Sequence, residues 1–393
     1  MNILFVANRF PYPPFRGDKL KIYNLAKRLS ENNTLYLVTF IQDKNDYQHL
    51  PELEKIFKEI KLVYLPARKS YLNLLYSFFS KVPYQVSYFR SRKFKKLVDE
   101  FVATHDIDVI HTQHLRMAPY TVDIDTVPTI LDLPDAFSLY WERRTQIKRN
   151  FFYSIFDKVE YKKVKNYEAI VKQFDFNLVC SPEDKAHIEK LHGIKNIDVL
   201  PNGVDLSAFT PRNHDYSHNN RIVFTGNMDY APNVDAVIYF VKEIFPKVLE
   251  KFPDVKFYIV GQRPIQKVLD LQSDKIIITG FVEDLGEEYN KSSITIAPIR
   301  FGAGTQNKVL ESMAMGVPVV CSNVGFKGLG VESSEGAFLA ETTEKFTQTV
   351  IDLLGSAELR EKVGKKGTEV IHERFNWDNI ANQLLGYFKN LSA

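Results

Sequence analysis

The sequence predicts an α/β protein of two domains, each built around a parallel β-sheet. Two observations predict this class. Short β-branched or aromatic runs alternate with longer amphipathic segments, which is typical of βαβ units. The alternation also stops at one polar stretch and then restarts, and 393 residues is about two to three times the length of a single core. We therefore predict a first domain over 1–200, a linker over 201–220 and a second domain over 221–375.

The first domain contains strand candidates separated by helical patterns. The first helix, Asp18–Ser30, has Leu25 and Leu29 on one apolar face. A long helical pattern over Leu139–Gln173 is unusual for a simple doubly wound fold. The predicted strands are Ile3–Asn8, Thr34–Phe40, Lys61–Leu65, Asp108–Thr112, Thr129–Leu133 and Asn177–Cys180.

The linker starts with turn chemistry at Pro201-Asn202-Gly203 and continues through the polar, aperiodic stretch 212–220. The second domain then repeats the alternation, with helices predicted at Val234–Phe252 and Lys308–Met315. Ligands of parallel sheets bind outside the carboxyl ends of the strands, so two such units predict a ligand cleft between them. The predicted strands are Ile222–Thr225, Lys256–Val260, Ile276–Thr279, Ile294–Pro298 and Val317–Cys321.

Composition excludes several classes of protein. Apolar residues make up 45% and charged residues 25%, which excludes a disordered chain, a collagen-like repeat and a coiled coil. No apolar run is long enough to span a membrane, and the N-terminal residues are typical of a strand and not of a signal peptide. The two cysteines, Cys180 and Cys321, lie in apolar runs, which predicts a reducing cytoplasm without disulfides.

Charge is unevenly distributed. The formal net charge of +3 hides a net of +7 over residues 1–200 and −4 over 201–393. The surplus is concentrated in residues 61–98, which contain basic and aromatic residues and no Asp or Glu. Two interpretations stay open: contact with an anionic membrane surface, and a core-packing helix with a solvated basic face. Nucleic-acid binding is not expected, because no known binding module frames the patch.

The most informative stretch is 294–318, where a glycine-containing loop joins a predicted strand to a helix. Gly302 and Gly304 free the backbone to approach a ligand, and the helix N-terminus presents unpaired N–H groups. Lys308 adds a positive charge that opposes the helix dipole unless an anion is bound. We predict a diphosphate site without a metal, with Glu311 one turn further on to accept hydrogen bonds from ribose hydroxyls.

Other interpretations of this loop fit less well. Asn307 stands where the dinucleotide-binding fingerprint needs its third glycine, and the loop lacks the Gly-Lys-Ser/Thr end of a P-loop. A glycine loop that only caps an ordinary helix remains an alternative. Thr305 can offer a hydroxyl to a ligand in either case.

A matching loop follows the first predicted strand. Gly17 lets backbone amides approach a phosphate or a leaving group, and Arg9, Arg16 and Lys19 supply positive charge. A proline-rich turn with a surface glycine explains this segment nearly as well. Both interpretations stay open.

Polar side chains end two further strands of the first domain. His111 and His114 lie where a histidine can hydrogen-bond a sugar hydroxyl or assist proton transfer. Zinc is not expected, because no Cys or further His accompanies them. Asp132 and Asp135 end the next strand, where they either bind acceptor hydroxyls or cap the following helix.

The whole chain resembles the retaining glycosyltransferases of family 4, which have the GT-B fold of two Rossmann-like domains facing across a cleft. The segments 132–136 and 305–308 resemble a subgroup associated with bacterial surface polysaccharide assembly. The landmarks of the family are Val199–Asp205, Phe224–Met228, Tyr258–Gly261, Gly280–Val282, Lys308–Val320 and Arg374–Trp377.

The resemblance implies a nucleotide-diphospho-sugar co-substrate in the second domain and no other cofactor. Lys308 and Thr305 would meet the diphosphate, Glu311 would hold the ribose, and the base would rest near Phe281 and Val282. The remaining donor-binding candidates are Gly226, Gly302, Gly304, Gln306 and Asn307.

In the first domain, the resemblance assigns Gly17 to a glycine loop and His111 or His114 to the region near the transferred sugar. The final helix, 376–393, would return to this domain. The acceptor-binding candidates are Arg16, Asp18, Asp132 and Asp135.

Two departures from the family pattern concern the donor. Ala303 stands where the first of a pair of glutamates is expected, and the usual Arg and Lys are missing from 226–233. The predicted function is metal-independent glycosyl transfer with retention to a glycan, lipid-linked or small-molecule acceptor, in the cytoplasm and peripheral to the inner face of the membrane. A sugar-nucleotide epimerase or hydrolase, and a catalytically silent binding protein, remain alternatives.

Overall fold

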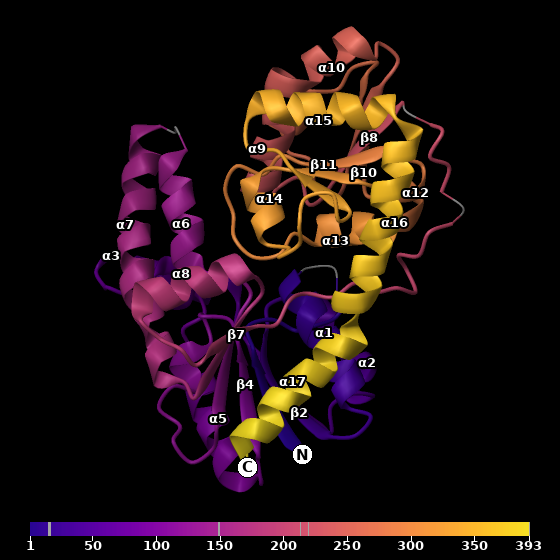
Figure 1. The fold of residues 1–393 in the computed structure, drawn as a ribbon. Coiled ribbons are helices and arrows are strands. Elements are labelled where there is room, and N and C mark those ends of the chain that lie inside the picture. The colour runs from indigo at the N-terminus through magenta and orange to yellow at the C-terminus, as the bar shows by residue number, and fades with distance from the viewer. Residues whose placement is uncertain (15–16, 148–149, 213, 219, 393) are drawn as a thin grey trace. The chain divides into compact units, whose positions relative to one another are not determined.

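The computed structural model describes residues 1–14, 17–147, 150–212, 214–218 and 220–392. It divides the chain into two compact units, drawn as ribbons in Figure 1. Unit 1 contains Met1–Asn202 and Trp377–Ala393, and unit 2 contains Gly203–Asn376. Unit 1 is thus assembled from two separate segments of the chain.

Unit 1 holds a seven-stranded parallel sheet with the strand order β3-β2-β1-β4-β5-β6-β7. The residues of its central strands are almost all buried because helices cover both faces of a parallel sheet. The strands are β1 (Asn2–Ala7), β2 (Thr34–Ile41), β3 (Glu59–Tyr64), β4 (Val109–Gln113), β5 (Thr129–Leu133), β6 (Phe176–Val179) and β7 (Ile197–Val199). The helices are α1 (Gly17–Leu29), η1 (Lys44–His49), α2 (Leu50–Glu54), α3 (Ala67–Phe78), α4 (Tyr84–Tyr88), α5 (Arg92–Thr104), η2 (Ala118–Tyr120), α6 (Phe137–Gln146), α7 (Phe151–Tyr167), η3 (Glu168–Gln173), α8 (Pro182–His192) and α17 (Trp377–Ser392).

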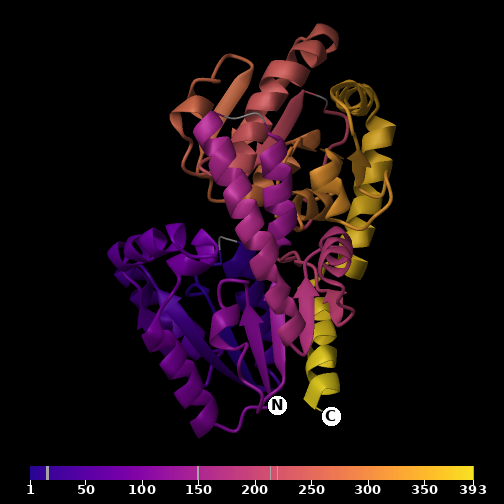
Figure 2. The ribbon, with the colours of Figure 1, turned by 90° about the vertical axis from the view of Figure 1, so that its left-hand side faces the viewer.

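The last helix, α17, packs beside α1 and along the sheet of unit 1 (Figure 2). Trp377 and Leu384 share an apolar core cluster with Ile22 of α1. At the surface, Arg28 Nε lies 2.5 Å from Asp378 Oδ1. The sequence between unit 2 and the C-terminus therefore completes the core of unit 1.

Unit 2 holds a six-stranded parallel sheet with the order β10-β9-β8-β11-β12-β13. The strands are β8 (Arg221–Thr225), β9 (Lys256–Val260), β10 (Ile276–Gly280), β11 (Ile294–Ala297), β12 (Val319–Cys321) and β13 (Ala337–Leu339). The helices are α9 (Ala231–Tyr239), the π-helical turn η4 (Phe240–Ile244), α10 (Phe245–Lys251), α11 (Gln266–Leu269), α12 (Leu285–Asn290), α13 (Asn307–Ala314), α14 (Asn323–Lys327), α15 (Thr343–Gly355) and α16 (Ala357–Arg374).

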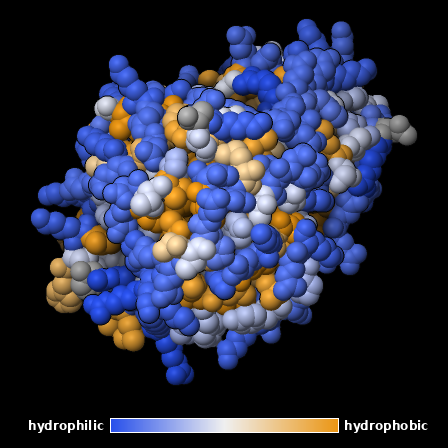
Figure 3. All heavy atoms as spheres, turned by 90° about the horizontal axis from the view of Figure 1, so that it is seen from below, coloured by the Kyte–Doolittle hydropathy of each residue, from blue (hydrophilic) through white to orange (hydrophobic). Residues whose placement is uncertain are grey.

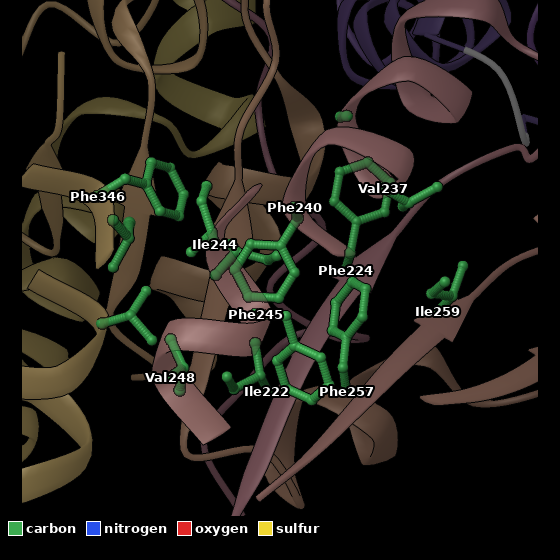
Figure 4. Packing of buried hydrophobic residues seen from close by; sticks show 14 of the residues in the cluster. Ile222, Phe224, Val237, Phe240, Ile244, Phe245, Val248, Phe257, Ile259 and Phe346 are labelled. Atoms are coloured by element: carbon green, nitrogen blue, oxygen red, sulfur yellow. The ribbon is translucent and has the colours of Figure 1, made fainter. Parts of the chain in front are cut away.

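Phenylalanine rings pack together with aliphatic side chains in the core of unit 2, as Figure 4 shows. The ring of Phe240 lies 4.7 Å from that of Phe257 on β9 and 5.7 Å from that of Phe245 on α10, centroid to centroid. Burying one such ring contributes about 1.5–3 kcal/mol. These contacts fasten the helices to the sheet whose edge carries the site described below.

Both sheets have the strand order of a Rossmann-like domain. In each sheet the first strand lies inside the sheet, and later strands are added first on one side of it and then on the other. β1 lies between β2 and β4, and β8 lies between β9 and β11. Ligands of such sheets bind outside the carboxyl ends of the strands at this reversal. The predicted fold class is confirmed.

Several predicted elements differ in detail. The pattern over Leu139–Gln173 forms α6, α7 and η3. The strands β7 and β13 were not predicted, since three residues are too few to show an alternation. The described part of 203–220, namely residues 203–212, 214–218 and 220, is also no free linker. Val204 N donates to Phe375 O at 2.8 Å, and the Tyr216 hydroxyl donates to Gly316 O at 2.9 Å, so this segment is fastened to unit 2.

Among the described residues, no helix combines the length and the apolar content needed to span a membrane. The face of the molecule in Figure 3 is mostly hydrophilic, with apolar side chains in patches between the polar ones. Cys180 and Cys321 are both buried, and neither forms a disulfide bond.

Candidate active site

Three neighbouring strand ends of unit 2 carry glycine. Gly226 and Gly261 follow β8 and β9, Gly280 ends β10, and their φ angles are +151°, +147° and +70°. A Cβ at Gly261 would lie 1.8 Å from Gly226 O, so only glycine fits there. The main chain at these strand ends therefore packs closely at Gly226 and Gly261, whereas a Cβ at Gly280 would meet nothing within 4 Å.

Lys308 lies in the first turn of α13, next to this edge. Its Nζ donates to Asn233 Oδ1 at 3.0 Å and lies 4.9 Å from the centroid of the Phe224 ring. Only 9% of the residue is exposed, and no described residue forms an ion pair with it. Burial lowers the pKa of Lys308 to about 8, although Glu311 opposes that change. A buried ammonium group with a neutral partner is a strong attractor for an anion.

Glu311 lies one turn further along α13 and is held by Tyr289. The Tyr289 hydroxyl lies 3.0 Å from Glu311 Oε2 and 2.6 Å from Thr225 Oγ1. Burial raises the pKa of Glu311, while Tyr289 and Lys308 act in the opposite direction. The carboxyl group is therefore fixed in place, and its residue remains partly exposed.

The loop before α13 packs closely against α14. Gly302 and Gly304 have φ angles of +148° and +73°, and a Cβ on Gly328 would lie 2.4 Å from Gly304 O. The Thr305 hydroxyl donates to Gly328 O at 3.3 Å. Gln306 occupies the N-cap position without a side-chain cap, and Asn307 begins the helix. The eight-residue helix thus presents its N-terminus beside Lys308, in the arrangement that favours an anion.

The remaining predicted residues of unit 2 are placed as follows. Phe281, directly after β10, is 67% exposed, which suits a surface on which a base can stack. Val282 is partly buried against Tyr289. Ala303 is buried in the loop. Arg300 is occupied by an ion pair with Asp235, with 2.5 Å between Nη2 and Oδ1.

Sequence reasoning missed the partners that position these groups. Asn233 and Tyr289 come from other elements, far from Lys308 in sequence. Arg263 was missed too, although it follows Gly261 by two residues. It has a positive φ of +57°, which is strained for arginine, and its Nη1 lies 3.3 Å from Asp229 Oδ2. It follows β9, and its charge is paired with that of Asp229.

In unit 1, a buried ionic cluster replaces part of the predicted site. Asp132 is fully buried, with Oδ1 accepting from Lys21 Nζ at 2.7 Å and Oδ2 lying 3.2 Å from His111 Nε2. His111 is fully buried as well, between the rings of Phe5 and Phe388. Neither side chain reaches the surface of the described structure, and the roles assigned to Asp132 toward an acceptor and to His111 toward a sugar stay predictions. Asp132 and His111 contact each other in the interior of unit 1, where Asp132 also contacts Lys21.

The cause is the local geometry of strand and helix. His111 is the middle residue of β4 and pairs in register with Phe5 of β1, so it does not end the strand. Burial alone would raise the pKa of Asp132, but Lys21 and His111 outweigh it and hold that pKa below its usual value. The cluster stays charged inside the unit.

His114 and Asp135 lie near the carboxyl ends of the strands, as predicted. His114 follows β4, has an unusual φ of +83° and is 3% exposed. Burial lowers its pKa well below the usual value, and Arg116 and Arg9 add to this effect. Burial, together with Asp184, raises the pKa of Asp135 to about 8, against the opposing charge of Arg116. At neutral pH the histidine is therefore neutral and the carboxyl group is protonated.

The glycine loop of unit 1 is described only in part. Gly17 begins α1, whereas Arg16 lies outside the described residues. Asp18 Oδ2 lies 2.8 Å from Arg9 Nη1, and Gln113 Nε2 donates to the Asp18 backbone carbonyl at 2.6 Å. These contacts join the start of α1 to the ends of β1 and β4. The roles assigned to Gly17, Arg16 and Asp18 stay predictions.

The two Rossmann-like sheets define the fold class of the chain, which is GT-B. Residues 22–208 match the family model described as Glycosyltransferase Family 4, and residues 219–356 match the model described as Glycosyl transferases group 1. The two matches together span most of the chain, and the chain is a glycosyltransferase of the family 4 type.

Relatives are distant in sequence. An uncharacterized 44.6 kDa protein in the cps region of Klebsiella pneumoniae is 22% identical, over 97% of this chain and 98% of its own length. The phosphatidyl-myo-inositol mannosyltransferase of Mycolicibacterium smegmatis is 25% identical, but the match covers only 49% of this chain and 52% of that protein.

Solved structures share the fold over the whole chain. Sucrose-phosphate synthase from Thermosynechococcus elongatus is 16% identical with a TM-score of 0.75, covering 100% of this chain and 99% of that one. The Anabaena protein HepE in complex with UDP is 14% identical with a TM-score of 0.70, covering 100% of both chains.

Proposed function

We propose that the enzyme takes a glycosyl group from a nucleotide-diphospho-sugar bound at unit 2 and transfers it, without a metal and with retention of configuration, to an acceptor bound at unit 1. One observation carries the donor assignment. Lys308 is a buried ammonium group at a helix N-terminus, and no described residue forms an ion pair with it. A diphosphate supplies the missing negative charge.

In this proposal, unit 2 stabilises the leaving group. When the bond between the anomeric carbon and the diphosphate oxygen breaks, negative charge grows on the diphosphate, beside Lys308 and the N-terminus of α13. Groups that are already oriented toward developing charge usually contribute most to catalysis. Glu311, held by Tyr289, would accept hydrogen bonds from the ribose, and the exposed ring of Phe281 would meet the base.

A uridine nucleotide is the first donor to test, because the HepE structure of similar fold is a complex with UDP. In unit 1, His114 would orient a sugar. Its Nδ1 accepts the backbone N–H of Arg116 at 3.2 Å, so the proton of the neutral ring belongs on Nε2. That N–H would donate to a hydroxyl group.

The test is calorimetric titration with UDP, GDP and their sugars, followed by product analysis with acceptors. Lys308→Met is expected to lose most of the activity and to weaken nucleotide binding at least tenfold, which is about 1.4 kcal/mol. The control is Lys267→Met, a charge change on the exposed helix α11. Unchanged binding and turnover in Lys308→Met would overturn the proposal.

A second candidate is a nucleotide-sugar-binding protein without transferase activity. The observation that favours it is Ala303, which offers no carboxylate to the donor sugar inside the loop. Nucleotide-sugar binding without turnover on any acceptor would support this candidate. Consumption of the donor without an acceptor would instead indicate an epimerase or a hydrolase.

We also propose that the enzyme works at the cytoplasmic face of a membrane on a lipid-linked acceptor. The predicted surface, residues 61–98, forms β3, α3, α4 and α5. Within it, Leu72, Leu75 and Phe78 of α3 are 59–73% exposed, which is unusual for apolar side chains of a globular unit. The relative from Mycolicibacterium smegmatis is itself named for a phosphatidylinositol acceptor.

A further inference from the structure

A basic cavity of about 320 Å³ opens in unit 1, and Arg116, which follows β4, is part of its lining. It lies among α4, the start of α5, η2 and the end of α7. Four cationic residues line it, namely Arg90, Arg92, Lys95 and Arg116, and no described Asp or Glu does. The rest of the lining includes apolar side chains such as Val86.

The charge around this cavity is only partly neutralised within unit 1. Lys95 Nζ lies 2.6 Å from Asp99 Oδ1 and 2.7 Å from Asp123 Oδ1. Arg116 has a neutral partner instead, since its Nη2 donates to Gln85 Oε1 at 3.0 Å. Arg90 and Arg92 are exposed.

The start of α5 adds to this positive field. Its first turn carries basic residues and no acidic one, whereas the helix dipole favours the reverse. Ser91 caps the helix by accepting from Phe94 N at 3.3 Å. A bound anion would relieve the repulsion between the helix N-terminus and its arginine.

Exposed apolar side chains lie on α3, which precedes the cavity-lining segment in sequence, and on α7, which lines the cavity with its last residue, Tyr167. Phe78 and Phe79, at the end of α3, are 73% and 94% exposed. Phe151 and Phe152, at the start of α7, are 71% and 78% exposed. The apolar patch, as we call it, consists of Tyr71, Leu72, Leu75, Phe78, Phe79, Phe151, Phe152, Tyr153, Ile155, Phe156 and Val159.

Hydrogen bonds connect the patch to the wall of the cavity. Lys163 of α7 donates to Ser77 O at the end of α3, and Ser77 Oγ donates at 3.0 Å to the carbonyl of Val82, which lines the cavity. The N–H of Tyr84, at the start of α4, donates to Glu160 Oε1 of α7 at 2.8 Å. Hydrogen bonds therefore join the segments that carry the cavity and the apolar patch within unit 1.

We infer that this cavity binds the phosphate group of an anionic membrane lipid while the apolar patch enters the bilayer. Arginine forks match phosphate oxygens, and bulky aromatic side chains beside basic ones are typical of a membrane interface. A lipid phosphate unites both chemistries in one ligand, whereas a soluble anion would leave the patch exposed. The idea that this lipid is also the acceptor of the sugar rests on the proposed function. The binding of the lipid does not rest on it.

The experiment is co-sedimentation of the full chain with vesicles of phosphatidylglycerol and phosphatidylcholine, and with vesicles of phosphatidylcholine alone. We expect binding to the anionic vesicles that falls as salt is added. Arg90→Ala combined with Arg92→Ala should weaken it more than tenfold, because each basic residue at such a surface contributes about fivefold. The matched control combines Lys93→Ala and Lys96→Ala, which removes the same charge from α5 without touching the cavity.

A second pair of variants tests the apolar patch. Phe78→Ser with Phe79→Ser should weaken vesicle binding at least tenfold, whereas Tyr47→Ser with Tyr64→Ser, aromatic positions elsewhere on unit 1 that are also exposed, should leave it unchanged. Equal losses in the variants and their controls would overturn the inference. So would absent vesicle binding, or an effect of the patch variants on oligomeric state alone.

Titration with UDP separates this inference from the proposed function. All unit 1 variants should keep the wild-type affinity for UDP, and a thermal unfolding profile like that of the wild type shows that unit 1 is folded in them. UDP binding without vesicle binding would refute the lipid site and leave the donor site standing. Vesicle binding without nucleotide binding would do the opposite.

Discussion

The affinity for UDP should fall as pH rises through 8, because Lys308 must be charged to hold the diphosphate. Burial lowers the pKa of this lysine to about 8 in the absence of a ligand. If only the charged form binds, affinity at pH 8 is about half that at low pH, and at pH 9 it is about one tenth. The change from pH 7 to pH 9 thus amounts to about 1.4 kcal/mol.

The diphosphate itself does not produce this dependence. The terminal phosphate has its second pKa near 6, so it is fully ionised before the lysine begins to lose its proton. A bound diphosphate stabilises the ammonium form and raises the pKa of Lys308. Binding at pH 8 should therefore take up about half a proton for each UDP bound, because half of the lysine is neutral beforehand.

Calorimetry measures both quantities when it is repeated in buffers of different ionisation enthalpy. Lys308→Met should bind UDP weakly, with no change between pH 7 and pH 9 and no proton uptake. The Lys267→Met control should follow the wild-type curve. Wild-type affinity that is constant from pH 7 to pH 9, with no proton taken up, would refute the assignment of Lys308 to the diphosphate.

Three further predictions concern stability. Lys308→Met should stabilise the ligand-free protein by up to about 3 kcal/mol below pH 8, because folding lowers the pKa of the buried lysine from 10.5 to about 8. This gain in the free energy of unfolding should shrink as the pH rises to 10.5. Chemical denaturation at pH 7 and at pH 10 measures the gain and its decrease. Gly261→Ala should abolish UDP binding or folding, because its Cβ would lie 1.8 Å from Gly226 O, and a soluble variant with normal UDP affinity would contradict the close approach. Asp132→Asn should cost about 3–5 kcal/mol because it leaves the Lys21 ammonium buried without its anion, and denaturant titration showing a loss below 1 kcal/mol would contradict the ionic cluster.

Sequence reasoning succeeded where a local pattern reports the environment. The strands of both sheets are apolar runs because both faces of a parallel sheet are covered, so β1, β2, β5, β8 and β9 were found almost to the residue. The helix that carries Lys308 and Glu311 was found because its N-terminus has a recognisable composition and spacing, while the roles of these two residues stay predictions.

It failed where the environment depends on distant chain segments. Nothing near His111 shows that Phe388 of the last helix covers it, and nothing near Asp132 shows that Lys21 of the first helix neutralises it. Asn233 likewise has no pattern that indicates its contact with Lys308, 75 positions along the chain. Such contacts are made by the topology of the sheet, which places the ends of separate strands at one edge.

The segments that enter and leave unit 2 lie side by side. Val204 and Asn376 form a parallel bridge, and Val204 N donates to Phe375 O at 2.8 Å. Unit 2 is thus topologically an insertion between Asn202 and Trp377, and its two ends are joined by main-chain contacts. A cut at this point leaves each unit with adjacent ends. Unit 2 can therefore be exchanged for the corresponding unit of another glycosyltransferase by joining the chains at two neighbouring positions, while unit 1 is kept intact.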